Sequence, residues 1–262
     1  MVVWFRGGLI GAILLAGLTL AMAVPCLAAI DQAQILQLLE RAKNGDASAV
    51  ETLRQAAEDG DPLAQTGLAT VFIAGLGGVA RDDAQAARWT RVAAEQGFVP
   101  AEFDLGLLYL AGRGVERDDA QAVHWIESAA RQGYAPAQYN LALLYYSGRG
   151  VAKSDEQAAA LLQQASDQGI IPAKNNLALL YAVGRGVPKD TQKAASLFRE
   201  AADQGFVEAE YNLGVLYATG EGVKKNPAEA KAWFEKAAAS GHPGARQALQ
   251  TLANQSPKQG HK

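Results

Sequence analysis

Apolar residues recur along the chain in two alternating stretches, with polar and glycine-rich segments between them. The first stretch is shown by its third copy, in which Ala137 is followed by Leu141, Leu144 and Tyr145. Steps of three and four residues place these side chains on one stripe of a helix. The same stripe recurs 36 residues before and after it. The pattern therefore predicts a series of equivalent amphipathic helices.

Glycine divides the chain into units of nearly constant length. Successive units end at Gly60, Gly97, Gly133, Gly169, Gly205 and Gly241. The spacing is 36 residues after the first step of 37, where the doubled Gly77-Gly78 accommodates the extra residue. Five repeats follow, with the boundaries 61–97, 98–133, 134–169, 170–205 and 206–241. A fixed period of this size is typical of solenoid proteins.

Each unit is predicted to contain a first helix that ends at glycine and a second helix that begins at a capping residue. Gly112 and its equivalents suit the left-handed conformation of a helix C-terminus. The second stretch follows Asp82, Asp118, Ser154, Asp190 or Asn226. Their side-chain oxygens can accept the free amide hydrogens of the first turn. Capping boxes are predicted where Gln or Glu stands three residues later, at Gln85, Gln121, Gln157 and Glu229.

Two such helices form a hairpin that cannot bury its apolar stripe alone, so the hairpins must stack on one another. The 36-residue period and strings such as AEYNLGVLYATGEGVKKNPAEAKAWFEKAAASGH resemble the Sel1-like repeat family, a relative of the tetratricopeptide repeat. The resemblance covers 61–241 and implies an all-α, right-handed α/α solenoid. Residues 29–60 would form N-terminal capping helices and 242–254 a C-terminal capping helix. We expect a disordered tail at 255–262.

Residues 1–28 are interpreted as a signal peptide. Arg6 precedes an apolar run from Leu9 to Val24, which is about one turn short of a bilayer span. Cleavage after Ala28 is favoured because polar sequence begins soon afterwards. The expected location is the periplasm or the outside of the cell. An uncleaved anchor and lipidation at Cys26 are alternatives, and the proline before Cys26 disfavours the second.

Composition excludes several classes of function. The chain of 262 residues carries 24 basic and 27 acidic residues, which disfavours a nucleic-acid partner. One cysteine and three histidines leave no set of residues for a disulfide, a metal centre or a nucleophile with its base. We therefore expect no enzyme activity, no cofactor and no metal, and no membrane span in the mature chain.

The resemblance implies a protein that binds proteins, because Sel1-like proteins act as adaptors, as regulators and as accessory parts of envelope assemblies. The favoured hypothesis is an exported scaffold that holds a protein partner on its concave face. The alternative is an accessory protein of polysaccharide or envelope assembly that binds a glycan or the cell wall.

In related tetratricopeptide arrays the first helix of each hairpin lines the concave face. Transferring that geometry gives the candidate partner-binding residues Phe103, Asp104, Tyr139, Asn140, Tyr146, Asn176, Tyr211 and Asn212. An asparagine row could bind the backbone of an extended peptide. It could equally bond neighbouring helices within the array, and the aromatic positions could serve packing.

A basic rim is the second candidate surface. Arg113, Arg149 and Arg185 occupy the same loop position in successive units, and Glu221 ends the row. Stacking would align the arginines, which could then meet an acidic partner or a polymer that bears carboxylates. They could also be solvated or paired with nearby acids.

Overall fold

The computed structural model describes residues 30–255, which form thirteen α-helices and, within that range, no strand. The helices are α1 (Gln32–Lys43), α2 (Ala47–Glu58), α3 (Pro62–Ala74), α4 (Asp83–Glu95), α5 (Val99–Ala111), α6 (Asp119–Arg131), α7 (Ala135–Ser147), α8 (Asp155–Asp167), α9 (Ile171–Val183), α10 (Thr191–Asp203), α11 (Val207–Thr219), α12 (Pro227–Ala239) and α13 (Ala245–Gln255). Each helix packs on the next one in sequence. The predicted all-α fold of stacked hairpins is confirmed. The proposed signal peptide and residues 256–262 lie outside the described residues.

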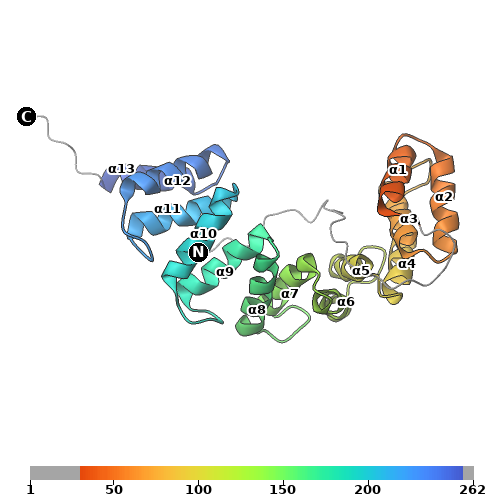
Figure 1. Ribbon diagram of the computed structural model, residues 1–262, viewed down its shortest axis with the longest axis horizontal. Coiled ribbons are helices and arrows are strands. Elements are labelled where there is room, and N and C mark those ends of the chain that lie inside the picture. The colour runs from red at the N-terminus through yellow and green to blue at the C-terminus, as the bar shows by residue number, and fades with distance from the viewer. Residues whose placement is uncertain (1–29, 256–262) are drawn as a thin grey trace, which may run out of the picture.

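The hairpins form a curved row, with α1 at one end and α13 at the other (Figure 1). In this view α7 and α9 lie toward the inner side of the curve, and α6 and α8 toward the outer side. We call α3, α5, α7, α9 and α11 the inner helices, and α4, α6, α8, α10 and α12 the outer helices. An inner helix and the outer helix that follows it make up one unit.

The helix ends follow the predicted capping residues, with one correction. All five inner helices end at a left-handed glycine, such as Gly112 with φ 63°. The side chain of Asp118 accepts hydrogen bonds from the first-turn amides of α6, as predicted. The capping boxes predicted on the outer helices do not form. The amide N–H of Asp118 donates instead to the carbonyl of Tyr109 on the inner helix, at 3.2 Å, so it is not free for Gln121. The same bond occurs in the other units.

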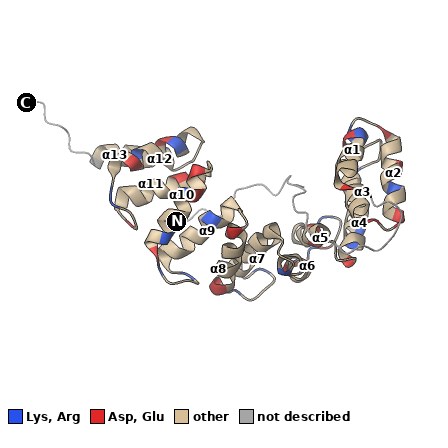
Figure 2. Cartoon of the chain, viewed as in Figure 1, with Lys and Arg blue, Asp and Glu red and all other residues tan. Residues whose placement is uncertain are grey.

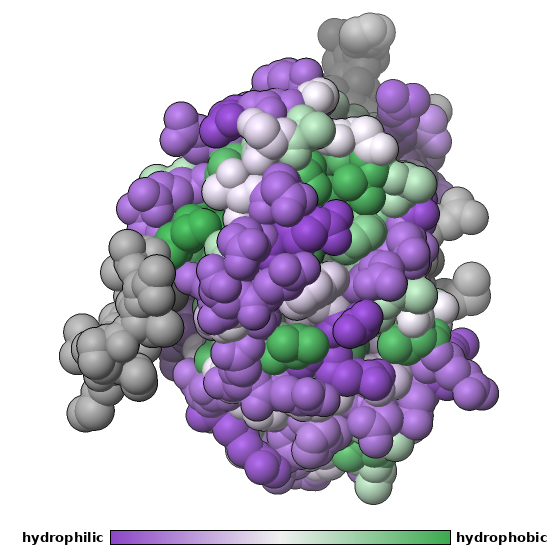
Figure 3. Space-filling model, turned by 90° about the vertical axis from the view of Figure 1, so that its right-hand side faces the viewer, coloured by the Kyte–Doolittle hydropathy of each residue, from purple (hydrophilic) through white to green (hydrophobic). Residues whose placement is uncertain are grey.

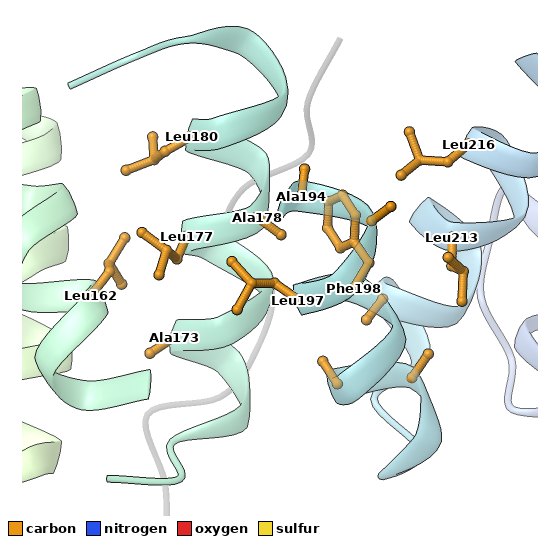
Figure 4. Packing of buried hydrophobic residues seen from close by; sticks show 14 of the residues in the cluster. Leu162, Ala173, Leu177, Ala178, Leu180, Ala194, Leu197, Phe198, Leu213 and Leu216 are labelled. Carbon is orange, nitrogen blue, oxygen red and sulfur yellow. The ribbon is translucent and has the colours of Figure 1, made fainter. Parts of the chain in front are cut away.

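Large side chains pack against small ones in the core. Leu177 of α9 and Leu213 of α11 are fully buried, with Leu197 and Phe198 of α10 between the two helices (Figure 4). Glycine is needed at Gly214 because an added Cβ would lie 2.7 Å from the ring of Phe234. The close packing of α11 on α12 within the fifth unit therefore depends on a residue without a side chain at this crossing.

The first hairpin, α1 and α2, closes the N-terminal end of the array. The face at this end is mostly hydrophilic, with separate small apolar patches (Figure 3). The largest exposed apolar side chain on α1 is Leu36, which is 50% exposed. At the other end α13 packs on α12. Each end thus carries a helix outside the repeated units.

Candidate partner-binding face

The three arginines of the predicted rim reach back to the preceding unit and pair with an aspartate there. Each aspartate is the first residue of an outer helix and lies 30 residues before its arginine. The pairs are Arg113–Asp83 (2.8 Å), Arg149–Asp119 (2.7 Å) and Arg185–Asp155 (2.7 Å). Arg149 also donates to the carbonyl of Leu110, at 2.9 Å. We call these three pairs the arginine ladder.

The charges of the ladder stabilise each other. Hydrogen bonds from Arg113 and then Arg81 lower the pKa of Asp83 to about 2, against the opposing effect of burial. Arg149 lowers the pKa of Asp119 further below its usual range. The side chain of Arg149 is 35% exposed. The ladder therefore joins units to one another and does not present a row of free cations.

The ladder ends between the fourth and fifth units. The arginine position is occupied there by Glu221, and the aspartate position by Thr191. Both members of the pair are absent together, so no arginine or aspartate of this set is left without its partner. The junction keeps its structure, because Gly222 still lies against the backbone of Thr191.

A glycine in each loop permits this close approach. The second glycine of the Gly-x-Gly motif has a positive φ, for example 69° at Gly150. A Cβ added there would overlap the backbone carbonyl of Asp119 in the preceding unit. The equivalent overlap at Gly222 involves the carbonyl of Thr191. The glycine thus fits one backbone against another at every junction of this type.

The predicted asparagine row is partly an internal hydrogen-bonded chain. Asn212 donates to Asn175 at 3.1 Å, Asn175 donates to Asn176 at 3.3 Å, and Asn176 donates to the hydroxyl of Tyr139 at 3.4 Å. Asn175 and Asn176 are buried. The structure therefore gives Asn176 a role within the array, and corrects its placement on a surface open to peptide. Asn140 is half-buried and donates to the carbonyl of Pro136 in its own helix, at 2.9 Å.

The aromatic candidates also have neighbours within the chain. Phe103 is buried and meets the ring of Tyr134 edge to face, so it does not form part of an open surface. The hydroxyl of Tyr146 accepts a 2.5 Å hydrogen bond from Arg185, whose guanidinium also lies over the ring.

At the C-terminal end Tyr211 stacks on His242, with 4.1 Å between the ring centroids. Tyr139, Tyr146 and Tyr211 are half-buried. They remain on the inner face with part of each side chain exposed.

Asp104 differs from the other candidates. It is half-buried on α5, at the position that asparagine fills in the next three units. Burial raises the pKa of its carboxyl to about 7. In the described part of the chain no basic side chain forms an ion pair with it. Its carboxylate raises the pKa of the Tyr134 phenol, after the larger effect of burial there.

A separate set of polar side chains lies on the buried side of the inner helices. Gln132 donates to Glu102 at 2.7 Å, and burial raises the pKa of Glu102. In the fourth unit Lys174 takes this position and pairs with Glu200 at 2.6 Å. In the fifth unit Glu210 is 6% exposed, and burial raises its pKa as well. Glu102 and Lys174 thus bond to neighbouring side chains, whereas Oε2 of Glu210 has no hydrogen-bond partner among the described residues, and the set is closed to a large ligand.

The aspartate partners of the arginines were not predicted from the sequence, although a signal was present. Each arginine has an acid 30 residues before it, and acid and arginine disappear together at Thr191 and Glu221. The spacing of 30 residues becomes meaningful once the stacking of one unit on the next is known.

Two further findings concern the described residues, 30–255. No group of three or more His, Cys, Asp or Glu side chains is arranged to hold a metal ion. No helix in this range has the length and apolar character needed to cross a bilayer.

Solved structures with the same stacked hairpins define the class of this solenoid. A protective antigen present in uropathogenic Escherichia coli strains, which displays an SLR fold, is 37% identical with a TM-score of 0.75. The match covers 78% of this chain and 43% of the antigen, so the chain spans less than half of that protein. A Sel1 repeat protein from Oxalobacter formigenes is 30% identical with a TM-score of 0.74, over 85% of this chain and 88% of the other. The comparison with curated proteins gave no match.

The Sel1 repeat family matches five consecutive segments of this chain, at 62–98, 99–134, 135–170, 171–206 and 207–242. The chain belongs to the Sel1 repeat family, and it is a helical repeat scaffold. Each matched segment begins one residue after the boundary predicted from the glycine spacing.

Proposed function

We propose that this chain is an exported, non-catalytic scaffold that binds a protein partner along its inner face. The observation that carries the proposal is the surface of α7, at the middle of the array. This helix has no charged residue along its length (Figure 2) and exposes parts of Tyr139, Asn140 and Tyr146. A half-exposed surface of tyrosine and asparagine can offer both apolar area and hydrogen bonds to a peptide.

The alternative of glycan or cell-wall binding has less support. It relies on the aromatic row and on Arg113, Arg149 and Arg185 as glycan contacts, and all three arginines pair with aspartates of the preceding unit. Export is inferred from the sequence of residues 1–28. Partner binding on the inner face is the simpler use of the surfaces that remain open.

Tyr146→Ala tests the proposal with little change to the asparagine chain. The purified protein and the variant are immobilised and used to capture proteins from an envelope extract of the source cells. We expect a partner that is recovered in a fixed ratio by the wild-type protein, and at least tenfold less of it with the variant. The matched control is His124→Ala, which removes an exposed aromatic ring from the outer helix α6.

Equal capture by Tyr146→Ala and the wild-type protein would contradict the use of the inner face. Retention on peptidoglycan or an acidic polysaccharide, with loss of binding when Arg113, Arg149 and Arg185 are replaced by alanine, would favour the glycan alternative. Circular dichroism of each variant checks that the helices are intact.

A further inference from the structure

Asp104 differs from most residues at the equivalent position of the inner helices, a set that we call its column. The equivalent residues are Asn140, Asn176 and Asn212. The amides of Asn176 and Asn212 donate hydrogen bonds to the inner helix of the preceding unit. A carboxylate has no hydrogen to donate, so Asp104 cannot continue this chain toward α3.

The preceding inner helix does not supply donors to Asp104 in return. Thr66 of α3 occupies the position equivalent to Asn175, and its hydroxyl donates to the carbonyl of Leu63 at 2.8 Å. The hydroxyl of Thr70, one turn later, donates to the carbonyl of Thr66 at 3.0 Å. Gly67, in the column of Asp104 itself, has no side chain. Among residues 30–255, no side-chain donor bonds to the oxygens of Asp104 and no cation pairs with them to compensate their charge.

The inner helices carry an excess of acid. Their one basic residue is Lys174, which is tied to Glu200 of α10. Two acids of these helices, Glu102 and Glu210, are buried, whereas Asp104 is half-buried and Glu208 is exposed. Glu208 lies near enough to raise the pKa of Tyr139, as a smaller effect after burial. The accessible charge of the inner helices is therefore negative, and it complements a cation.

We propose that the partner segment held on the inner face is an extended peptide that carries a lysine or arginine, and that Asp104 binds this cation. The inference rests on the proposed function and adds the chemistry of the partner to it. An ammonium or guanidinium group supplies both the missing donors and the opposite charge. The neighbouring aromatic ring of Tyr134 gives the stem of such a side chain an apolar surface.

Asp104→Asn is a well-matched test because asparagine already occupies this column in three other units. The probe is a fluorescently labelled pentalysine peptide, with penta(acetyl-lysine) as the uncharged reference, titrated into the purified protein at pH 8. We expect at least tenfold weaker binding of pentalysine to Asp104→Asn than to the wild-type protein. The control Glu95→Gln removes the same charge from an exposed site at the end of α4 and should change the affinity less than twofold.

The pH dependence of binding provides a second readout. Since burial raises the pKa of Asp104 to about 7, pentalysine affinity should rise between pH 6 and pH 8 in the wild-type protein and stay flat in Asp104→Asn. The phenol of Tyr134 titrates well above this range, because burial and the charge of Asp104 both raise its pKa. Burial lowers the pKa of His242 below its ordinary value, and Glu208 opposes this as a smaller effect.

Unchanged binding to Asp104→Asn, or equal loss in Glu95→Gln, would overturn the inference. A partner that is captured equally by wild-type protein and Asp104→Asn, but lost with Tyr146→Ala, would overturn the cationic segment and leave the scaffold proposal standing. Both proposals are supported if Asp104→Asn weakens pentalysine binding, Tyr146→Ala lowers capture of the partner, and both variants keep their helices.

Discussion

The first three junctions between repeats and the fourth junction are built on the same backbone contact but differ in charge. At the first three, an arginine from one unit pairs with an aspartate of the unit before it. At the fourth, Glu221 and Thr191 replace that pair, yet Gly222 meets the preceding backbone as Gly150 does.

The difference separates what sets the stacking from what strengthens it. Close approach of backbones and burial of the apolar stripe occur at all four junctions, with or without an ion pair. The arginine ladder is therefore an addition to the contact and is not needed for its geometry. The glycine is common to both kinds of junction, so the two should respond alike when it is changed.

The largest effect is expected from Gly150→Ala, in the ladder, and Gly222→Ala, outside it. Each variant should lower the free energy of unfolding by about 3 kcal/mol, because a Cβ overlaps a carbonyl of the preceding unit and the backbone has positive φ. Thermal and urea unfolding measure the loss. Gly133→Ala is the control, since its φ is also positive but its Cβ would meet nothing within 4 Å. A similar loss in the control would show that strain alone, and not the junction, is responsible.

A smaller loss of stability is expected from Arg149→Ala, which removes one ion pair of the arginine ladder. At pH 7 the cost should be about 1 to 2 kcal/mol, because half-buried charged hydrogen bonds to Asp119 and the Leu110 carbonyl are lost. Because the pKa of Asp119 is lowered in the folded state, this stabilisation is present above pH about 4 and is lost as the pH falls toward the folded pKa.

The free energies of unfolding of Arg149→Ala and the wild-type protein should therefore approach each other as the pH falls below about 4. Arg88→Ala, an exposed arginine on the outer helix α4, should cost less than about 0.5 kcal/mol at either pH. A pH-independent difference for Arg149→Ala would assign the cost to packing of the arginine stem.

The smallest effect is expected from introducing an aspartate–arginine ion pair at the fourth junction. The double variant Thr191→Asp with Glu221→Arg should gain about 0.5 to 1 kcal/mol. Thr191→Asp alone should be slightly destabilising, because it places a second carboxylate near Glu221. A double-mutant cycle isolates the coupling between the two positions. Zero coupling would mean that the fourth junction differs from the others in geometry as well as in charge.

Much of the fold follows from the sequence because it depends on local rules that repeat. The steps of three and four residues, the glycine after each inner helix and the short polar residue before each outer helix act within one hairpin. The predicted capping boxes are the exception. The amide of Asp118 already donates to Tyr109 across the hairpin, and the pattern of one helix does not contain that bond.

The candidate face was less predictable because its side chains act between units. Arg149 is visible as part of a row, but its partner Asp119 depends on which loop lies over which helix start. Asn176 and Asn140 occupy the same column, yet one is buried against Tyr139 and the other bonds its own helix. The single aspartate of this column, Asp104, is recognisable from the sequence as a departure, and its lack of a donor on α3 required the structure.

The arginine ladder has a direction, because in each pair the aspartate belongs to the earlier unit and the arginine to the following one. Such a head-to-tail contact has no built-in end, so separate molecules could in principle add to one another without limit. The two terminal units lack the matching halves. Leu76 stands at the arginine position of the first unit, and Pro227 at the aspartate position of the last. The terminal units therefore carry no arginine or aspartate that could pair with another molecule in this way, which disfavours growth into filaments through this contact.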